Sequence, residues 1–167
     1  MLWTSYTDYQ MKKQPKKRKT KPANKFLQEQ CEDVWKQVVE ERDGRQCMVK
    51  KFFPEINITH TPVYQADHCF TRGNKYLFLD PCNGTMVCAS CNMAKHYDNK
   101  SVKRAVDYIV RAREGEEKWE EMLKIDMGLS ANHDWNKVWW LEAQLESLTM
   151  MLKPKEDVCT EDTTHGG

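Results

Sequence analysis

Hydrophobic positions recur at helical spacing on both sides of a central stretch that lacks this period. Between residues 26 and 42 they define one face of an amphipathic helix. The apolar residues of this face are Leu27, Cys31, Val34, Trp35, Val38 and Val39. Asp43-Gly44 is predicted to end the helix, because glycine can adopt the left-handed conformation of a helix cap. Trp35 is expected to anchor the core rather than to stack on a base.

The C-terminal third is predicted to form three helices. The first carries Val102, Ala105, Val106, Ile109 and Val110 on one face and is interrupted at Gly115. A shorter helix with Trp119, Met122 and Leu123 ends near Gly128. The third runs from about Asp134 to Leu152, with Asn132 or Asp134 as its N-cap. Its apolar residues alternate three and four apart as Val138, Leu141, Leu145, Leu148 and Leu152. This seam is either a homodimer contact or packs back on its own domain.

The central stretch is predicted to hold a hairpin with a long loop. Residues 47–64 are interrupted by Pro54 and Pro62 and are expected to be loop with one short strand at most. A strand over 63–70 pairs with a second over 85–88, and the tip of the loop between them spans 71–75. A helix begins at 92–96. The fold class is therefore α+β, a hairpin flanked by N-terminal and C-terminal helices.

The charge distribution points to nucleic acid. Among 167 residues the net charge is only +1, but residues 11–25 carry seven lysines and one arginine without an acid. This segment contains too few apolar groups to form a core and is expected to be a disordered arm that docks on DNA phosphates. The candidate contacts in the arm are Lys12, Lys13, Lys16, Lys17, Arg18 and Lys19. The alternative is a solvated tail.

Cysteine usage favours a metal site. Seven cysteines in a chain without an apolar signal segment indicate metal ligands rather than disulfides. Cys88 and Cys91 have zinc-knuckle spacing and Cys47 is the candidate third ligand, but Lys50 stands where a second CxxC would place a cysteine. The fourth ligand stays open among Cys82, Cys69, His60 and Cys31. The alternative is that Cys88 and Cys91 are reduced core thiols.

The central stretch also holds residues that suit phosphodiester hydrolysis. His68 is the candidate general base, because imidazole titrates near neutrality. Asp67 and Asn92 offer hard oxygen ligands for Mg²⁺ or Mn²⁺. Asn83 is expected to hold the hairpin loop and the His68 ring by hydrogen bonds. Neighbouring strand residues point to opposite faces, so Asp67 and His68 can share a site only if the strand ends, twists or bulges there.

The ordered set Asp67-His68, Asn83 and Cys88-x-x-Cys91-Asn92-x-x-Lys95 resembles the HNH nucleases, whose fold is a ββα-metal unit. The segments around residues 34–47, 82–96 and 107–122 are similar to the phage NinG (Rap) recombination family. The resemblance implies His68 as general base, Asp67 and Asn92 as metal ligands with His96 as the rival third ligand, and Asn83 as the structural middle residue. It implies a nuclease that cuts branched DNA such as Holliday junctions and D-loops.

On this interpretation the chain divides into a basic arm over residues 1–25, a nuclease domain over 26–128, a C-terminal helix over 129–153 and a disordered tail over 154–167. Arg72, Lys75 and Lys95 are expected to contact DNA, along with the lysines of the arm. No apolar run reaches the length of a membrane span, and a cytoplasmic location is expected, in a bacterium or a phage-infected host. The alternatives are a non-catalytic zinc-dependent DNA-binding module and a less specific restriction or toxin-type nuclease.

Overall fold

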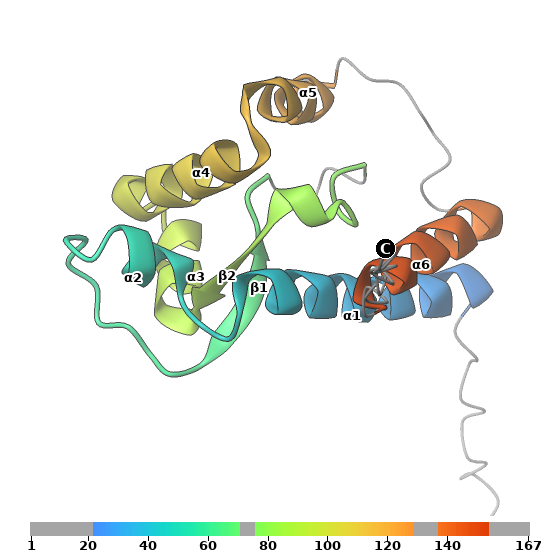
Figure 1. Ribbon diagram of the computed structural model, residues 1–167, viewed down its shortest axis with the longest axis horizontal. Helices are drawn as coiled ribbons and strands as arrows, with labels where there is room; N and C mark the ends of the chain where they lie inside the picture. Colours follow the sequence, from blue (N-terminus) through green and yellow to red (C-terminus); the bar gives the residue numbers. More distant parts are fainter. Residues whose placement is uncertain (1–21, 71–75, 129–136, 154–167) are drawn as a thin grey trace, which may run out of the picture.

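The computed structural model describes residues 22–70, 76–128 and 137–153 (Figure 1). Several predictions fall outside these residues and are not addressed by it. They are the arm lysines and Arg18, Arg72, Lys75, the N-cap candidates Asn132 and Asp134, and the tail over 154–167.

The centre of the molecule is an antiparallel hairpin followed directly by a helix. Strand β1 (Tyr64–His68) pairs with β2 (Gly84–Cys88), with Tyr64 opposite Cys88 and His68 opposite Gly84. Helix α3 (Ala89–His96) begins at the residue after β2. The long-loop hairpin and the mixed α+β class are therefore confirmed. β2 is buried at every position, because helices contact it as well as β1.

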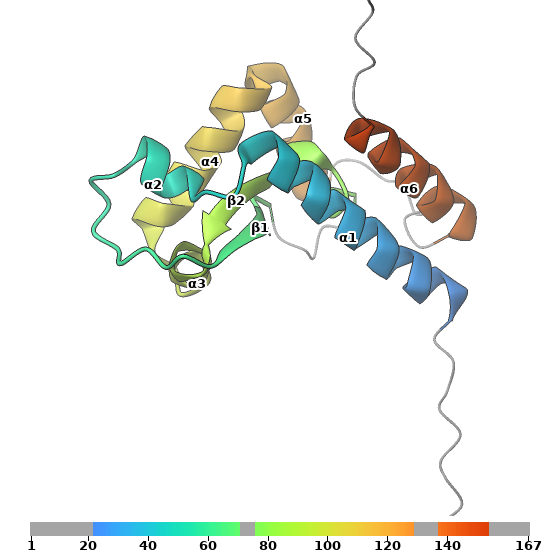
Figure 2. The same ribbon diagram turned by 60° about the horizontal axis from the view of Figure 1, so that its bottom comes forward.

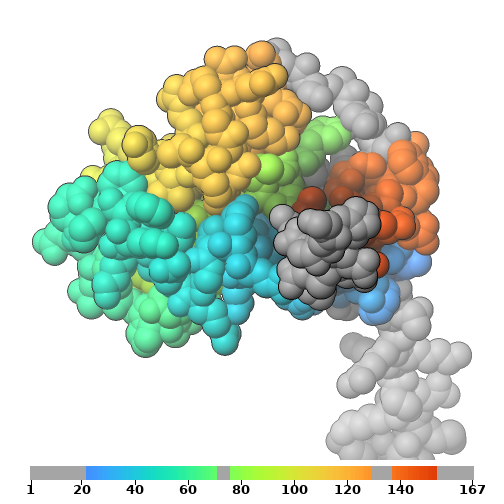
Figure 3. All heavy atoms as spheres, in the orientation of Figure 1, coloured from blue at the N-terminus to red at the C-terminus, as the bar shows by residue number. Residues whose placement is uncertain are grey.

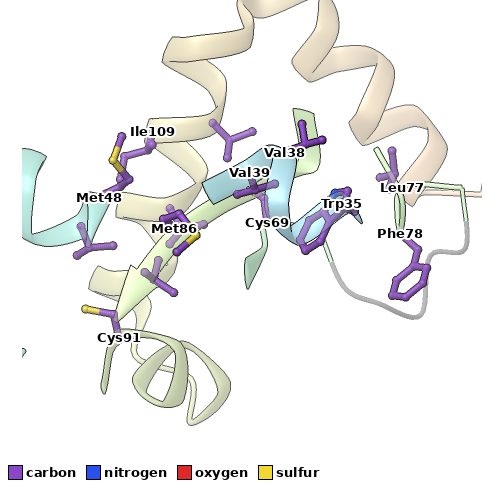
Figure 4. Close-up of a cluster of buried hydrophobic side chains, with 14 of the residues drawn as sticks. Trp35, Val38, Val39, Met48, Cys69, Leu77, Phe78, Met86, Cys91 and Ile109 are labelled. Atoms are coloured by element: carbon purple, nitrogen blue, oxygen red, sulfur yellow. The ribbon is translucent and has the colours of Figure 1, made fainter. Parts of the chain in front are cut away.

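Helix α1 (Ala23–Asp43) crosses the hairpin and supplies one wall of the core (Figure 2). Its predicted apolar face is confirmed, since Cys31, Trp35, Val38 and Val39 are buried. Figure 4 shows Trp35, Val38 and Val39 gathered with Met86 of β2 in one hydrophobic cluster. The helix ends at Gly44, whose φ of 74° favours glycine, although its ψ of 169° is not that of the predicted left-handed cap.

The prediction of an irregular segment over residues 47–64 was wrong in part. Helix α2 (Met48–Phe52) forms there, with Met48 and Val49 buried. The prolines that suggested a loop lie beyond its C-terminal end and do not interrupt it. A five-residue helix has little intrinsic stability, so burial of these two side chains against the domain holds it in place.

The C-terminal helices follow the predicted pattern, except that the third begins at Val138 rather than near Asp134, with Lys137 in the N-cap position. Helices α4 (Lys100–Glu114) and α5 (Glu116–Asp126) are separated by Gly115, which has a φ of 83°. Helix α6 (Val138–Leu152) packs along α1 (Figure 1). Leu141 and Leu148 are each 2% exposed and belong to the same core cluster as α1.

Two of the predicted seam residues, Leu141 and Leu148, thus pack against the domain of their own chain. The thiol of Cys31 donates a hydrogen bond to the carbonyl oxygen of Leu141 at 3.3 Å, which joins the two helices. The outward side of α6 exposes Trp139 and Met150. Within the described ranges, no helix has the length and apolar character needed to cross a bilayer.

Candidate functional site

Four side chains from four parts of the chain meet in a Cys/His cluster, which consists of Cys47, His60, Cys88 and Cys91. Cys47 precedes α2, His60 lies in the segment before β1, Cys88 ends β2 and Cys91 lies in the first turn of α3. Their ligand atoms all lie within 4.8 Å of one another. The sulfur atoms of Cys47 and Cys91 are 3.7 Å apart, and His60 Nδ1 lies 3.4 Å from Cys88 Sγ and 3.5 Å from Cys91 Sγ.

These separations fit a tetrahedral metal ion. With zinc–sulfur bonds of about 2.3 Å, two sulfur ligands at tetrahedral angles lie roughly 3.8 Å apart. The three cysteines are buried, so the cluster is closed as a structural site requires. It can hold a metal ion such as zinc. His60 is the fourth member, which closes the question that the sequence left open.

The other candidates for the fourth position lie elsewhere. Cys69 donates a hydrogen bond to Asp107, and Cys31 lies between α1 and α6. Cys82 lies in the short 3-10 helix that precedes β2. The signal for His60 is weak in the sequence, because its spacing from the knuckle depends on the path of the segment between α2 and β1.

Within the cluster, the surroundings of Cys88 favour its thiolate form. Burial alone would raise the pKa of its thiol, but hydrogen bonds from the backbone amide of Cys91, from His60 and from the amide of Thr61 hold the pKa at about 6. Burial raises the pKa of Cys91 instead. A thiolate at Cys88 is the form that binds metal ions.

A second site lies where β1 ends against α3. A cavity of about 510 Å³, the Asp67 cavity, is lined by Gln65, Ala66, Asp67, His68, Cys69, Asn92, Lys95, His96 and Lys103. It therefore brings together the predicted base, both predicted metal ligands and the rival ligand His96. Asn92 Oδ1 is buried without a hydrogen bond, and the buried Asp67 Oδ2 pairs with the ammonium group of Lys95. Two buried hard oxygen atoms, one of them without a donor, suit a divalent cation.

Lys95 supplies the positive charge in this cavity. Its ammonium group forms an ion pair with Asp67 Oδ2 and donates a hydrogen bond to the carbonyl oxygen of His68. The side chain of Lys95 is only 11% exposed. The residue predicted to contact DNA is thus held by the predicted metal ligand, and it occupies the position of a counter-ion to Asp67.

The ring of His68 is held in a fixed orientation. It stacks on Trp35 with a centroid distance of 4.0 Å and an interplanar angle of 4°, and Phe78 lies parallel at 5.4 Å. Nε2 lies 2.8 Å from the carbonyl oxygen of Phe78. A carbonyl only accepts hydrogen bonds, so Nε2 carries the proton and the basic lone pair lies on Nδ1. Trp35 is a core anchor, as predicted, and also a platform for His68.

Asn83 ties both ends of the hairpin loop together. Its side-chain oxygen accepts a hydrogen bond from the amide of Phe70 at 2.7 Å, and its amide nitrogen donates to the carbonyl of Leu77 at 2.9 Å. Its backbone oxygen accepts from the amide of Cys69 at 2.7 Å. Asn83 therefore holds the loop, as predicted. These three hydrogen bonds join Asn83 to backbone atoms on either side of the loop, next to the His68 ring.

Of the irregularities expected at Asp67 and His68, only the end of the strand is present, because Asp67 pairs regularly with Thr85 and His68 with Gly84. Regular pairing of β1 ends at His68, and the two side chains leave in different directions. Asp67 extends toward Lys95 of α3, and His68 toward Trp35 of α1. Both residues line the Asp67 cavity, although their side chains point in different directions.

A buried ion network supports the start of β2 and was not anticipated from the sequence. Asp43 is 5% exposed and accepts hydrogen bonds from Arg42, from Thr85 Oγ1 at 3.1 Å and from the amide of Met86 at 2.9 Å. Burial raises the pKa of Asp43, but Arg42, the Met86 amide and Arg113 outweigh it, and the pKa lies below its usual value. The network fixes β2 against the C-terminal end of α1.

Comparison of the chain with models of protein families, with curated proteins and with solved structures finds no match in any of the three. The residues of the two sites therefore carry the functional conclusion.

Proposed function

We propose that the chain is a metal-dependent DNA endonuclease of the HNH type that hydrolyses phosphodiester bonds in branched DNA. One observation carries this proposal. The unpartnered, buried Asn92 Oδ1 and the buried carboxylate of Asp67, which Lys95 neutralises, line a cavity together with His68, whose ring orientation is fixed. A binding module has no use for such a combination.

Asp67 and Asn92 are the residues that would hold the catalytic Mg²⁺ or Mn²⁺, and Lys95 would leave Asp67 when it binds. The ion would supply positive charge to the phosphate and the leaving oxygen. His68 accepts the proton of the attacking water at Nδ1, while Nε2 keeps its hydrogen bond to Phe78. The water oxygen bonds to phosphorus as the bond from phosphorus to a sugar oxygen breaks. Stacking on Trp35 keeps Nδ1 pointing in one direction.

The Cys/His cluster would hold a structural Zn²⁺ that fixes α3 to the hairpin. It has four ligand atoms, so no position is left for a substrate. Cys91 of the cluster directly precedes Asn92 of the Asp67 cavity. A fixed knuckle therefore orients the first turn of α3, which carries Asn92.

Branched DNA and a homodimer stay predictions. The cavity is bordered by Lys95 and Lys103, whose ammonium groups would contact phosphate without reading sequence. The inner side of α6 packs on α1, so a dimer through this helix would have to use its exposed face, where Trp139 lies.

The test is cleavage of labelled Holliday-junction, D-loop and linear duplex DNA with Mg²⁺ or Mn²⁺. We expect His68→Ala to lower the rate about 10²- to 10⁴-fold, because the general base is lost. Asn92→Ala is expected to abolish cleavage at low metal concentration, whereas the control His96→Ala retains it. Circular dichroism melting identifies variants that do not fold, and Asp67→Asn provides an independent loss of activity.

Equal cutting of the three substrates would retain the nuclease and exclude structure specificity. If wild type binds DNA but does not cut it, the second candidate function is favoured, a non-catalytic zinc-dependent DNA-binding module. The assembled Cys/His cluster supports that alternative, because a DNA-binding module of this kind needs only the cluster and a basic surface.

A further inference from the structure

A second cavity lies on the other side of α4 from the Asp67 cavity. This Tyr108 cavity has a volume of about 640 Å³ and lies between residues 53–57, which follow α2, and the first turns of α4. Figure 3 shows α2 and α4 side by side at this end of the molecule. Among the side chains that line it are Arg104, Tyr108, Phe53 and Asn57.

Tyr108 is a large aromatic surface held in place. Its side chain is 63% exposed, and its ring meets Phe53 at 5.5 Å and an angle of 90°. An edge-to-face contact leaves at least one face of the tyrosine ring uncovered. A flat exposed ring with restricted motion is a platform on which a nucleic-acid base can stack.

Arg104 lies one helical turn before Tyr108 and supplies positive charge. Arg104 is exposed and lines the Tyr108 cavity, and among the residues that the structure describes it has no ion-pair partner. Glu55 is the cavity's carboxylate, and Asn57 offers an amide to a base edge. An arginine for a phosphate, a ring for a base and an amide for its edge match a nucleotide better than a peptide or an apolar ligand.

The two cavities share the first turns of α4. Lys103 lines the Asp67 cavity and Arg104, the next residue, lines the Tyr108 cavity. Lys103 pairs with Asp107 on its own helix, which leaves Arg104 as the uncompensated cation of this pair. Consecutive residues of α4 therefore line the two cavities.

We propose that the Tyr108 cavity binds an unpaired nucleotide of the DNA substrate, with the base stacked on Tyr108 and its phosphate on Arg104. The proposal rests on the proposed DNA substrate and names the class that the site takes, DNA with single-stranded or unstacked nucleotides beside the cut. A fully paired duplex cannot present a base to the ring without unstacking it.

The test is binding of fluorescein-labelled oligothymidylate and of a blunt hairpin duplex, measured by anisotropy without Mg²⁺ or Mn²⁺. We expect Tyr108→Ala to weaken binding of the single strand roughly five- to hundredfold and to leave duplex binding unchanged. Tyr108→Phe is expected to bind as wild type does. The matched control is Tyr97→Ala, because Tyr97 is 82% exposed and does not line the cavity.

Arg104→Ala gives an independent measurement. The slope of log K against log salt is negative, and loss of one phosphate contact makes it shallower by about 0.7 for a single strand. Arg45→Ala is the charge-matched control, since Arg45 lies outside the cavity and pairs with Glu40. Unchanged single-strand affinity for Tyr108→Ala, or equal losses for Tyr97→Ala, would overturn the proposal.

These results separate the two proposals. Tyr108-dependent binding without cleavage by wild type would remove the nuclease function and keep the nucleotide site. Cleavage that requires His68, combined with single-strand binding that does not depend on Tyr108, would keep the nuclease function and remove the nucleotide site.

Discussion

The Cys/His cluster and the Asp67 cavity are both candidate metal sites, yet they differ in how complete each is. The cluster has three cysteine sulfur ligands and one imidazole nitrogen ligand within 4.8 Å of one another. The cavity has two hard oxygen ligands, and Lys95 already pairs with one of them. A site that is closed by protein ligands stabilises the fold, whereas one that leaves its metal accessible can admit a substrate. The two sites meet at Cys91 and Asn92, which are consecutive in α3.

Removal of a cluster ligand should have the largest effect. We expect Cys88→Ser to lose the capacity to bind zinc and to unfold, because a structural zinc at the cluster would contribute on the order of 10 kcal/mol, as much as a whole domain's stability. Zinc content by mass spectrometry and far-ultraviolet circular dichroism check this. The control Cys82→Ser, outside the cluster, should keep both. A folded, metal-free Cys88→Ser protein would mean that the cysteines are core thiols.

The ion network at Asp43 should matter less and should spare the cluster. Asp43→Asn leaves Arg42 and Arg113 without their shared carboxylate, and we expect a loss of about 2–3 kcal/mol, below the range for fully buried pairs because both arginines are partly exposed. The zinc content should stay unchanged. Chemical denaturation measures the loss.

The pH dependence of this loss follows from the direction of the pKa shift. The pKa of Asp43 is lower in the folded protein than its ordinary value of about 3.9. Its contribution is therefore present above that value and disappears as the pH falls through the folded pKa. The stability difference between wild type and Asp43→Asn should shrink below pH ~4. A constant difference down to the acid transition would contradict this assignment.

A smaller change in the core, Gly84→Ala, should affect the Asp67 cavity and leave the Cys/His cluster intact. A Cβ on Gly84 would lie 2.5 Å from Val39 Cγ2 and 2.8 Å from Trp35 Cζ2, so Gly84→Ala should destabilise the protein by about 1–3 kcal/mol. Trp35 must shift, and His68 stacks on it. We therefore expect the rate of DNA cleavage to fall even under conditions where the variant is fully folded. Its zinc content should match that of wild type. Normal cleavage by the folded variant would show that the role of His68 does not depend on its stacking against Trp35.

The smallest effect should come from Lys95. Lys95→Met removes the ammonium group that competes with a metal ion for Asp67, so Mg²⁺ should bind up to about tenfold more tightly. Titration calorimetry on the zinc-loaded protein measures the affinity directly. Lys103→Met is the control in the same cavity, because Lys103 pairs with Asp107. Weaker Mg²⁺ binding in Lys95→Met would show that Lys95 supports the metal site.

Local patterns in the sequence predicted helices α1 and α4, the hairpin and the role of Asn83 in the loop. They did not predict α2, because a helix of five residues depends on burial of Met48 and Val49. The choice of His60 depends on how residues 53–63 fold back onto the knuckle, and the Asp43 network joins residues 43 positions apart. Long-range packing decides such contacts, and short-range periodicity carries no information about it.

The contact between α1 and α6 has a consequence during synthesis. Cys31 and Leu141 are separated by 110 positions, and domains form as the chain emerges from the ribosome at about 5–20 residues per second. The apolar side of α1 that faces α6 must therefore stay uncovered for several seconds while the hairpin and the knuckle emerge. A chain interrupted before residue 138 would leave that surface exposed, which marks incomplete copies for chaperones and proteases.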